Sequence, residues 1–298
     1  MTQEPARRLF RELQALARAD YGGNTGALLV VYAVEGFLRR LAASEYASKM
    51  TLKGGMLLAA LSARRMTRDA DLATVGLDND ERAVAAVVVE IAATVLDVDD
   101  GLEFDAASVR TEVMREDAEY HGVRVKLTAR LATAKITTTL DFSFGDPRRS
   151  TVIELPELLG TGSISLASYP PELSLAEKVA TMMSRRELNT RDRDFADVWV
   201  LSRVHSFVAG DLRAAIIEVA DHRRHEVVPL RVALADMPDR QAPYAAMVAR
   251  MAYQRPPPSS WTELVADLSA FIDPLIADRD GDVETWDPAA AGWTVAGR

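Results

Sequence analysis

The spacing of apolar residues predicts two helices at the beginning of the chain. Apolar positions recur every three to four residues in residues 4–20 and again in residues 25–44. The segment Gly22-Gly23-Asn24 lies between these two stretches and favours a turn. The chain is therefore expected to begin with two separate helices.

A strand, a tight turn and a helix are predicted next. Residues 50–52 are β-compatible, Lys53-Gly54-Gly55 provides the turn, and apolar residues return at helical spacing in residues 56–61. Residues 69–75 alternate between polar and apolar side chains, which is typical of a strand. Residues 81–96 then have the pattern of a long amphipathic helix.

The middle of the chain has the pattern of a sheet and the remainder that of helices. Polar and apolar residues alternate with a period close to two from residue 102 to residue 144, and Gly145-Asp146-Pro147 ends this stretch. We place a domain boundary near residue 165, giving a first domain of residues 1–165 and a second of residues 166–298. Helices in the second domain are expected at residues 173–187, 191–204, 211–222 and 260–277.

Composition limits the class of protein. Hydrophobic residues make up 48% of the 298 residues and charged residues 27%, which is typical of a globular chain. The longest uncharged apolar runs, residues 27–34 and 83–89, are far shorter than the roughly 18 residues of a membrane span, so no membrane association is expected. The first twenty residues contain charges throughout and do not resemble a secretory signal, so a cytoplasmic location is expected.

Charge and metal-ligating residue types limit the chemistry. The chain has no Cys and only 4 His, so a metal ion is expected to bind to oxygen ligands. The net charge of −9 argues against a protein that coats nucleic acid with its whole surface, although a local basic patch remains compatible with it. Only five of the 35 basic residues are lysines, which makes each lysine in a motif more informative.

The strongest candidate site combines a glycine turn with acidic residues. Asp69 and Asp71 are two positions apart in a predicted strand, so both carboxylates project from one face and suit a hard cation such as Mg²⁺. Asp141, within a second β-prone segment, is the candidate for a third ligand, and a solvent-facing strand residue is the alternative. Gly54 and Gly55 open a helix, where backbone N–H groups can approach phosphates.

Other polar residues near this motif are candidates for nucleotide contacts. Lys53 directly precedes the glycine pair, and Thr67 and Arg68 directly precede Asp69, where an ammonium, a hydroxyl and a guanidinium can bind phosphate oxygens. A basic rim for an RNA backbone is a further hypothesis, with ordinary surface arginines as the alternative. The rim would comprise Arg64, Arg65, Arg68, Arg148, Arg149, Arg185, Arg186, Arg191 and Arg193.

These motifs resemble a known enzyme family. A glycine pair, a spacer, Asp-x-Asp and a later strand aspartate are similar to the signature of the DNA polymerase β-like nucleotidyltransferases. Residues 140–147, 169–178 and 189–199 resemble the AbiEii/AbiGii-type toxin nucleotidyltransferases, including their MenT-like branch. The resemblance covers roughly residues 50–203. It implies an α+β fold, with a mixed-sheet nucleotidyltransferase core and flanking helices joined to a mainly helical C-terminal domain, and an active site in the cleft between the two domains.

The resemblance also implies roles for single residues. Asp69 and Asp71 would bind two Mg²⁺ ions, with Mn²⁺ as an alternative, and Asp141 would complete the site of the attacking oxygen. Lys178 is predicted to bind the triphosphate, and a capping-box pattern at Ser174 and Glu177 predicts that its helix begins at Ser174, with Lys178 in the first turn. The alternative for Lys178 is an ordinary surface lysine.

Asp194 is predicted by the resemblance to orient Lys178 or the nucleotide. It lies three residues from Asp197, so both acids share one face of a predicted helix. A solvated charged face is the alternative for this pair. Nearby apolar residues would form the packing side of the same helix.

The function implied is that of a toxin in a toxin–antitoxin system. Such an enzyme transfers a nucleoside monophosphate from a nucleoside triphosphate to an acceptor, here expected to be the 3′ end of tRNA, which blocks translation until a cognate antitoxin neutralises it. One alternative is transfer to a hydroxyl of a protein or a small molecule. Another is an inactive module that only binds nucleotide or antitoxin. The preferred nucleotide and the oligomeric state do not follow from the sequence.

Overall fold

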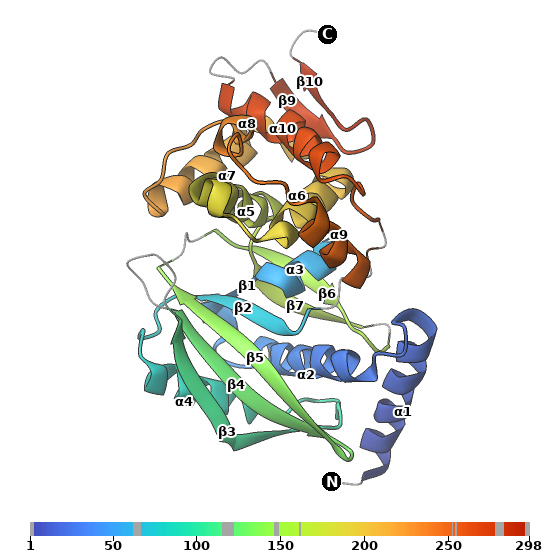
Figure 1. Cartoon of the computed structure of the whole chain (residues 1–298). Helices are drawn as coiled ribbons and strands as arrows, with labels where there is room; N and C mark the ends of the chain where they lie inside the picture. Colours follow the sequence, from blue (N-terminus) through green and yellow to red (C-terminus); the bar gives the residue numbers. More distant parts are fainter. Residues whose placement is uncertain are drawn as a thin grey trace. The chain divides into compact units, whose positions relative to one another are not determined.

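The fold is described from a computed structural model of the chain. It describes residues 3–61, 67–114, 122–145, 149–160, 162–251, 253, 255–277 and 283–295. The chain forms two compact units (Figure 1). The first unit ends at Ser168, and the second contains the chain from Tyr169 onward. Each unit is described by itself.

A mixed seven-stranded sheet forms the centre of the first unit among the residues described. Its strand order is β3-β4-β5-β2-β1-β7-β6. Two neighbouring pairs, β2 with β5 and β1 with β7, are parallel, and the other pairs are antiparallel. The strands are β1 (Met50–Lys53), β2 (Asp69–Thr74), β3 (Leu102–Met114), β4 (Gly122–Leu131), β5 (Ala134–Phe144), β6 (Thr151–Pro156) and β7 (Ser163–Ser168). The predicted α+β class with a mixed sheet is therefore confirmed.

The first two helices, α1 (Gln3–Asp20) and α2 (Thr25–Ala42), confirm the predicted helical start of the chain. Asn24 ends the turn between them, and its side chain accepts a hydrogen bond from the N–H of Ala27, which caps α2. Leu13 of α1 and Leu28 of α2 are fully buried in one apolar cluster with residues of β3, β4 and β5. Burial of this cluster fixes α1 and α2 against the sheet.

The helix α4 (Glu81–Ala92) lies on the same face of the sheet as α2 (Figure 1). Asp80 caps its first turn by accepting hydrogen bonds from the N–H groups of Arg82 and Ala83. The helix ends at Ala92, before the predicted end at residue 96. The next residues include two β-branched side chains, which lose rotamer freedom in a helix, followed by an acidic turn.

Strand β4 shows how the pleat separates the two faces of the sheet. Five alternate side chains of this strand are at most 2% exposed on the face that α1, α2 and α4 cover: Val123, Val125, Leu127, Ala129 and Leu131. The side chains between them point to the other face, because successive residues of a strand alternate. Lys126 and Arg130 on that face are exposed. The sheet thus has one apolar face and one polar face.

The second unit is mainly helical. Its helices are α5 (Pro171–Arg185), α6 (Asp192–Val204), α7 (Ala209–His222), α8 (Leu230–Ala233), α9 (Gln241–Arg250) and α10 (Trp261–Ala277). The four helices expected from the sequence are confirmed as α5, α6, α7 and α10. The structure adds a small sheet, which the sequence analysis did not predict. Its strands are β8 (Phe207–Val208), β9 (Val283–Asp287) and β10 (Gly292–Val295).

The start of α5 differs from the prediction. The helix begins at Pro171, with Pro170 at its N-cap, and not at Ser174. Proline has a fixed φ suited to the first helical position, and its missing N–H costs nothing there. The hydroxyl of Ser174 caps nothing; it is buried inside the helix without a hydrogen-bond partner in the described part of the chain. Lys178 consequently lies beyond the first turn of α5.

Candidate active site

Three aspartates of the first unit are brought together by strand pairing. Asp69 and Asp71 lie on β2, and Asp71 is directly opposite Asp141 of the parallel neighbour β5. Lys53 of β1 is opposite Asp71 on its other side, and Arg124 of β4 is opposite Asp141. Residues in register on neighbouring strands point to the same face. These side chains therefore form a row across four strands, on the polar face of the sheet.

The glycine turn lies directly against this row. Gly54 has a positive φ of 63°, and a Cβ atom at this position would lie 1.8 Å from Oδ2 of Asp71. Only glycine tolerates both this backbone conformation and this close approach. The N–H of Gly55 points to the same carboxylate oxygen at a long distance of 3.4 Å. The predicted association of the glycine pair with the acidic pair is thus present in the structure.

The carboxylate of Asp71 has an altered proton affinity. Its pKa is raised to about 6, mainly by burial and then by repulsion from Asp69. Repulsion from Asp141 also raises this pKa, whereas Lys53 and the Gly55 N–H lower it. Lys53 therefore offsets only part of the negative charge. The region around Asp71 is one where an added cation would be stabilised.

Thr67 and Arg68 precede the acidic pair and differ in their surroundings. Thr67 is 5% exposed, and its hydroxyl donates to Oδ1 of Asp69 at 2.7 Å. A threonine hydroxyl has one proton, so in this arrangement Thr67 orients Asp69 and is not free to donate to a phosphate. Arg68 is exposed. Of the two, Arg68 has the side chain that is accessible to a phosphate.

Arg124 is a partner of Asp141 that the sequence analysis missed. Its Nε and Nη2 atoms donate to the two oxygens of Asp141 at 2.8 and 2.7 Å, which is a bidentate ion pair. The hydrogen bonds to Asp141 raise the pKa of Arg124, so the guanidinium stays charged. Asp141 is only 8% exposed, and this pairing explains how its charge is tolerated there. The pairing of Arg124 with Asp141 follows from the register of β4 against β5, which the periodicity of the sequence does not reveal.

The donor atoms suit a hard cation, but they are not gathered into a finished coordination site. Among the residues described, no group of three or more acidic or histidine side chains is arranged to hold a metal ion. Asp69 and Asp71 still present oxygen ligands on one face of one strand, which suits Mg²⁺. Both oxygens of Asp141 are bound by Arg124. Asp69 and Asp71 therefore suit a cation without rearrangement. Asp141 can bind a cation only if Arg124 releases one of its oxygens.

Lys178 belongs to a separate cluster in the second unit. Its Nζ lies 2.6 Å from Oδ1 of Asp194 and 3.0 Å from Oδ2 of Asp197. Arg191 lies 2.8 Å from the other oxygen of Asp194. The two aspartates are 4% and 5% exposed. The predicted pairing of Asp194 with Lys178 is present, and Asp197 is a second carboxylate on the same ammonium group.

The first turn of α6 is held by another ion pair. Both oxygens of Asp192 accept hydrogen bonds from Arg240, at 2.9 and 2.8 Å. The ring of Phe195 is fully buried and packs against Trp261 of α10. These contacts fix the helix that carries Asp194 and Asp197, and therefore the position of the carboxylates around Lys178.

The arginines proposed as a basic rim are only partly described. Arg64, Arg65 and Arg148 lie outside the described residues. The other six are exposed, and Arg191 among them binds Asp194. They belong to both units, the first holding Arg68 and Arg149 and the second Arg185, Arg186, Arg191 and Arg193. The rim stays a prediction.

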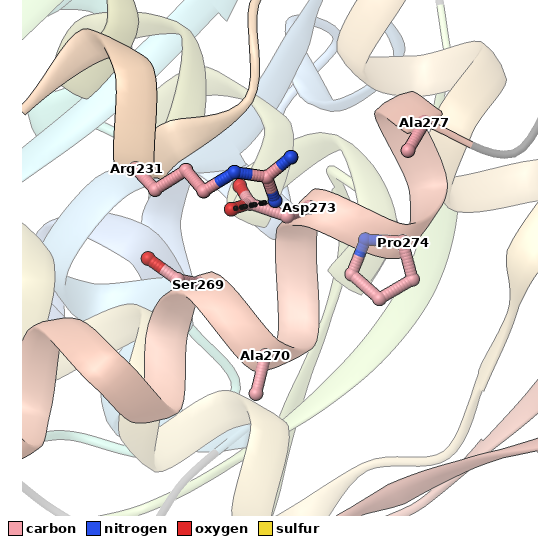
Figure 2. Close-up of a pocket in the computed structure, with 6 residues that line it drawn as sticks. All are labelled: Arg231, Ser269, Ala270, Asp273, Pro274 and Ala277. Carbon is pink, nitrogen blue, oxygen red and sulfur yellow. Dashed lines mark hydrogen bonds and ion pairs between the residues drawn. The ribbon is translucent and has the colours of Figure 1, made fainter.

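A surface hollow of about 460 Å³ lies in the second unit, between α8 and α10 (Figure 2). Arg231 and Asp273 at its edge form an ion pair of 3.0 Å, and Asp273 also accepts a hydrogen bond from the N–H of Leu230. These contacts hold α8 against α10. The residues predicted from the sequence to act in catalysis or nucleotide binding do not line this hollow.

Comparison with known families decides the class. A family model described as "Nucleotidyl transferase AbiEii toxin, Type IV TA system" matches residues 36–268. The chain belongs to the AbiEii nucleotidyltransferase family. It is therefore a nucleotidyltransferase, related to the toxin components of toxin–antitoxin systems. The resemblance inferred from the sequence is confirmed.

Solved structures and curated proteins add the following comparisons. The crystal structure of JHP933 from Helicobacter pylori has 17% identity, with coverage of 72% of this chain and 84% of that chain and a TM-score of 0.42. An antigenic nucleotidyltransferase-like protein from Paracoccidioides brasiliensis has 17% identity, with coverage of 68% and 93% and a TM-score of 0.34. No curated protein matches the chain. Within the described residues, none of the helices has the length and apolar character needed to cross a membrane.

Proposed function

We propose that this AbiEii-family chain is a toxin that transfers a nucleoside monophosphate from a nucleoside triphosphate to the 3′ end of tRNA, with Mg²⁺ as cofactor. The observation that carries the proposal is the row of Lys53, Asp71, Asp141 and Arg124, with the Gly54 turn against Asp71. This arrangement offers oxygen ligands for a cation and backbone N–H groups for a phosphate on one face of a sheet.

Each residue of the first unit has a defined part in this proposal. Asp69 and Asp71 hold the cation, and Thr67 keeps the carboxylate of Asp69 oriented through its 2.7 Å hydrogen bond. When bound, Mg²⁺ neutralises the phosphate oxygens and lowers the pKa of a coordinated hydroxyl. Asp141 lies next to Asp71. With one of its oxygens released by Arg124, it would complete the cation site on the side of the attacking oxygen and accept the proton of the acceptor hydroxyl. Lys53 and the glycine turn bind the outer phosphates.

Lys178 of the second unit binds the triphosphate in this proposal. Asp194 and Asp197 both form ion pairs with its ammonium group and hold it in place. In this proposal the ammonium group of Lys178 binds a phosphate oxygen of the triphosphate. The two aspartates are positioning residues, because they act through Lys178.

The reaction balances as a single displacement at phosphorus. The acceptor oxygen forms a bond to the α-phosphorus, and the bond from this phosphorus to the bridging oxygen of the β-phosphate breaks. Pyrophosphate leaves with the electron pair of that bond. The hydroxyl proton passes to Asp141 and then to solvent.

The net charge of −9 is the one observation that favours the other acceptor class, a hydroxyl of a protein or small molecule, because it disfavours nucleic-acid binding outside a local basic patch.

Transfer of labelled nucleotide tests the proposal. The full chain is incubated with each α-labelled nucleoside triphosphate, Mg²⁺ and either total RNA or total protein. The proposal predicts label in tRNA and its loss in Asp71→Asn. Asp20→Asn, an exposed acid at the end of α1, is the matched control and should leave the incorporation unchanged. Label in protein alone selects the other acceptor class, and no label in any fraction identifies an inactive binding module.

A cognate antitoxin is the second partner in this proposal. The family is described as a toxin of a type IV toxin–antitoxin system, which implies an antitoxin as partner. Expression of the chain alone is expected to arrest growth, and expression of Asp71→Asn is not. Equal growth arrest by both forms would show that toxicity does not depend on the carboxylate site.

A further inference from the structure

The polar face of β4 and β5 carries basic side chains outside the candidate active site. Lys126 and Arg130 of β4 and Lys135 of β5 are exposed on this face. Arg130 and Lys135 are opposite one another in the antiparallel pairing, and Lys126 is opposite Thr139. Two of the five lysines of the chain therefore lie on this short hairpin.

The three cations have no ion-pair partners within the described part of the chain. Glu103 of β3 is in register with Arg130, but no ion pair joins them. Asp105, farther along β3, accepts a hydrogen bond from the N–H of Ala107 in its own strand. Lys126 is opposite another cation, Arg110, and like charges in direct register destabilise a sheet. A bound anion would relieve this repulsion.

The basic face runs toward the acidic residues along the same two strands. From Lys135 to Asp141 along β5 is about 20 Å at the rise of an antiparallel strand. Thr137 and Thr139 lie on the same face between these two residues, and hydroxyls of this kind are common partners of phosphate oxygens. The length corresponds to a few nucleotides of an extended strand.

We propose that the polar face of β4 and β5, with Lys126, Arg130 and Lys135, binds the sugar-phosphate backbone of a single-stranded end of the acceptor RNA and leads its terminal hydroxyl to Asp141. This inference rests on the proposed function, because it assigns a surface to the nucleic-acid acceptor of that reaction. The cations contact phosphates and not bases, so binding is independent of base sequence and sensitive to salt.

Binding of RNA without catalysis tests this inference. The probe is a fluorescein-labelled single-stranded polyuridylate of about 12 nucleotides, and its anisotropy is measured with the full chain from about 50 to 200 mM KCl. The variant Lys126→Ala/Arg130→Ala loses two phosphate contacts. The slope of log K against log salt is expected to fall by about 1.4, which corresponds to about 25-fold weaker binding at 0.1 M KCl.

The control is a variant with the same change in net charge elsewhere in the first unit. Arg18 of α1 and Arg82 of α4 are exposed on helices that cover the opposite face of the sheet. Arg18→Ala/Arg82→Ala should bind the RNA like the unmodified chain. Equal losses in both double variants, unchanged binding in the β4 variant, or no RNA binding by the unmodified chain would each overturn the inference. The thermal midpoint of each variant verifies that it is folded.

Two further measurements separate the possible causes of failure. Binding of Mg²⁺ with a non-hydrolysable nucleoside triphosphate should be unchanged in Lys126→Ala/Arg130→Ala, because these residues lie outside the nucleotide site. If Lys126→Ala/Arg130→Ala leaves nucleotide binding, transfer and RNA binding all unchanged, the proposed RNA-binding face is wrong and the proposed function stands. If a polyglutamate peptide binds to this face as tightly as the RNA and with the same dependence on the two cations, the partner is an acidic protein and the inference is wrong.

Discussion

Substitution of Gly54 by alanine tests the contact between the glycine turn and the acidic residues. The φ of Gly54 is 63°, and an added Cβ would lie 1.8 Å from Oδ2 of Asp71. An ordinary van der Waals contact begins near 3.4 Å, so the carboxylate must move by 3.4 − 1.8 = 1.6 Å to make room. Displacements of about 1 Å at a reacting group can cost about 100-fold in rate. Gly54→Ala is therefore expected to lower nucleotide transfer by about 100-fold or more.

Gly76→Ala provides a matched control for this substitution. Gly76 also has a positive φ, 70°, but a Cβ there would meet nothing within 4 Å. In both variants the free energy of unfolding should fall by about 1 kcal/mol, because a side chain disfavours the left-handed backbone conformation. Only Gly54→Ala also displaces Asp71. Initial rates of labelled-nucleotide incorporation and urea unfolding measure the two effects. If both variants retain the same activity, the glycine turn does not position Asp71 for catalysis.

Three further substitutions or titrations have defined expected outcomes. Lys178→Met leaves two buried carboxylates without their shared ammonium, so the free energy of unfolding should fall by about 3 kcal/mol in urea unfolding, and Lys178→Arg should lose less. Arg124→Gln removes both charged hydrogen bonds to Asp141 and should cost about 1 to 2 kcal/mol of stability by the same measurement, because the arginine is partly exposed. The pKa of Asp71 is raised to about 6, so metal affinity measured by calorimetry should fall about tenfold per pH unit below this value, since the protonated carboxyl cannot bind a cation.

The same pKa predicts how stability depends on pH without metal. A carboxyl with a pKa above its value in the unfolded chain binds its proton more tightly in the folded state. Asp71 therefore favours the folded state at low pH, and this contribution is lost as pH rises from about 4 to about 6. Asp71→Asn should remove this part of the pH dependence. An unchanged stability profile in that variant would contradict the assignment.

Local sequence patterns predicted much of the first unit. The glycine turn, the Asp69-x-Asp71 strand and the two initial helices follow from side-chain periodicity and backbone preferences within a few residues. The common face of Asp69 and Asp71 follows from the pleat alone. These features were predictable because the interactions that determine them are local.

The pairing of Arg124 with Asp141 was not predictable in the same way. It depends on the register between β4 and β5, and a shift of one residue would place Arg124 on the opposite face. The start of α5 was mispredicted because two patterns competed. The prolines at 170 and 171 fixed the first turn, and the Ser174 pattern, although suitable for a cap, fell inside the helix.

The small sheet of the second unit was missed for a further reason. β8 has two residues, and it pairs with β9, which lies far along the chain. Trp286 and Trp293 from this sheet pack on Phe271 of α10, so tertiary burial, and not local propensity, stabilises these strands. Two residues are too few to show the alternation of polar and apolar side chains from which a strand is predicted.

In the proposed reaction, the carboxylates of β2 and β5 hold the divalent cation used for nucleotide transfer. Titration of the chain with Mn²⁺, followed by electron paramagnetic resonance in the presence of a non-hydrolysable nucleoside triphosphate, measures this binding directly. Mn²⁺ binding is expected to be at least about tenfold weaker in Asp71→Asn and in Asp141→Asn, and unchanged in the Asp20→Asn control. Equal Mn²⁺ affinity in the unmodified chain and in both site variants would show that these carboxylates do not hold the cation.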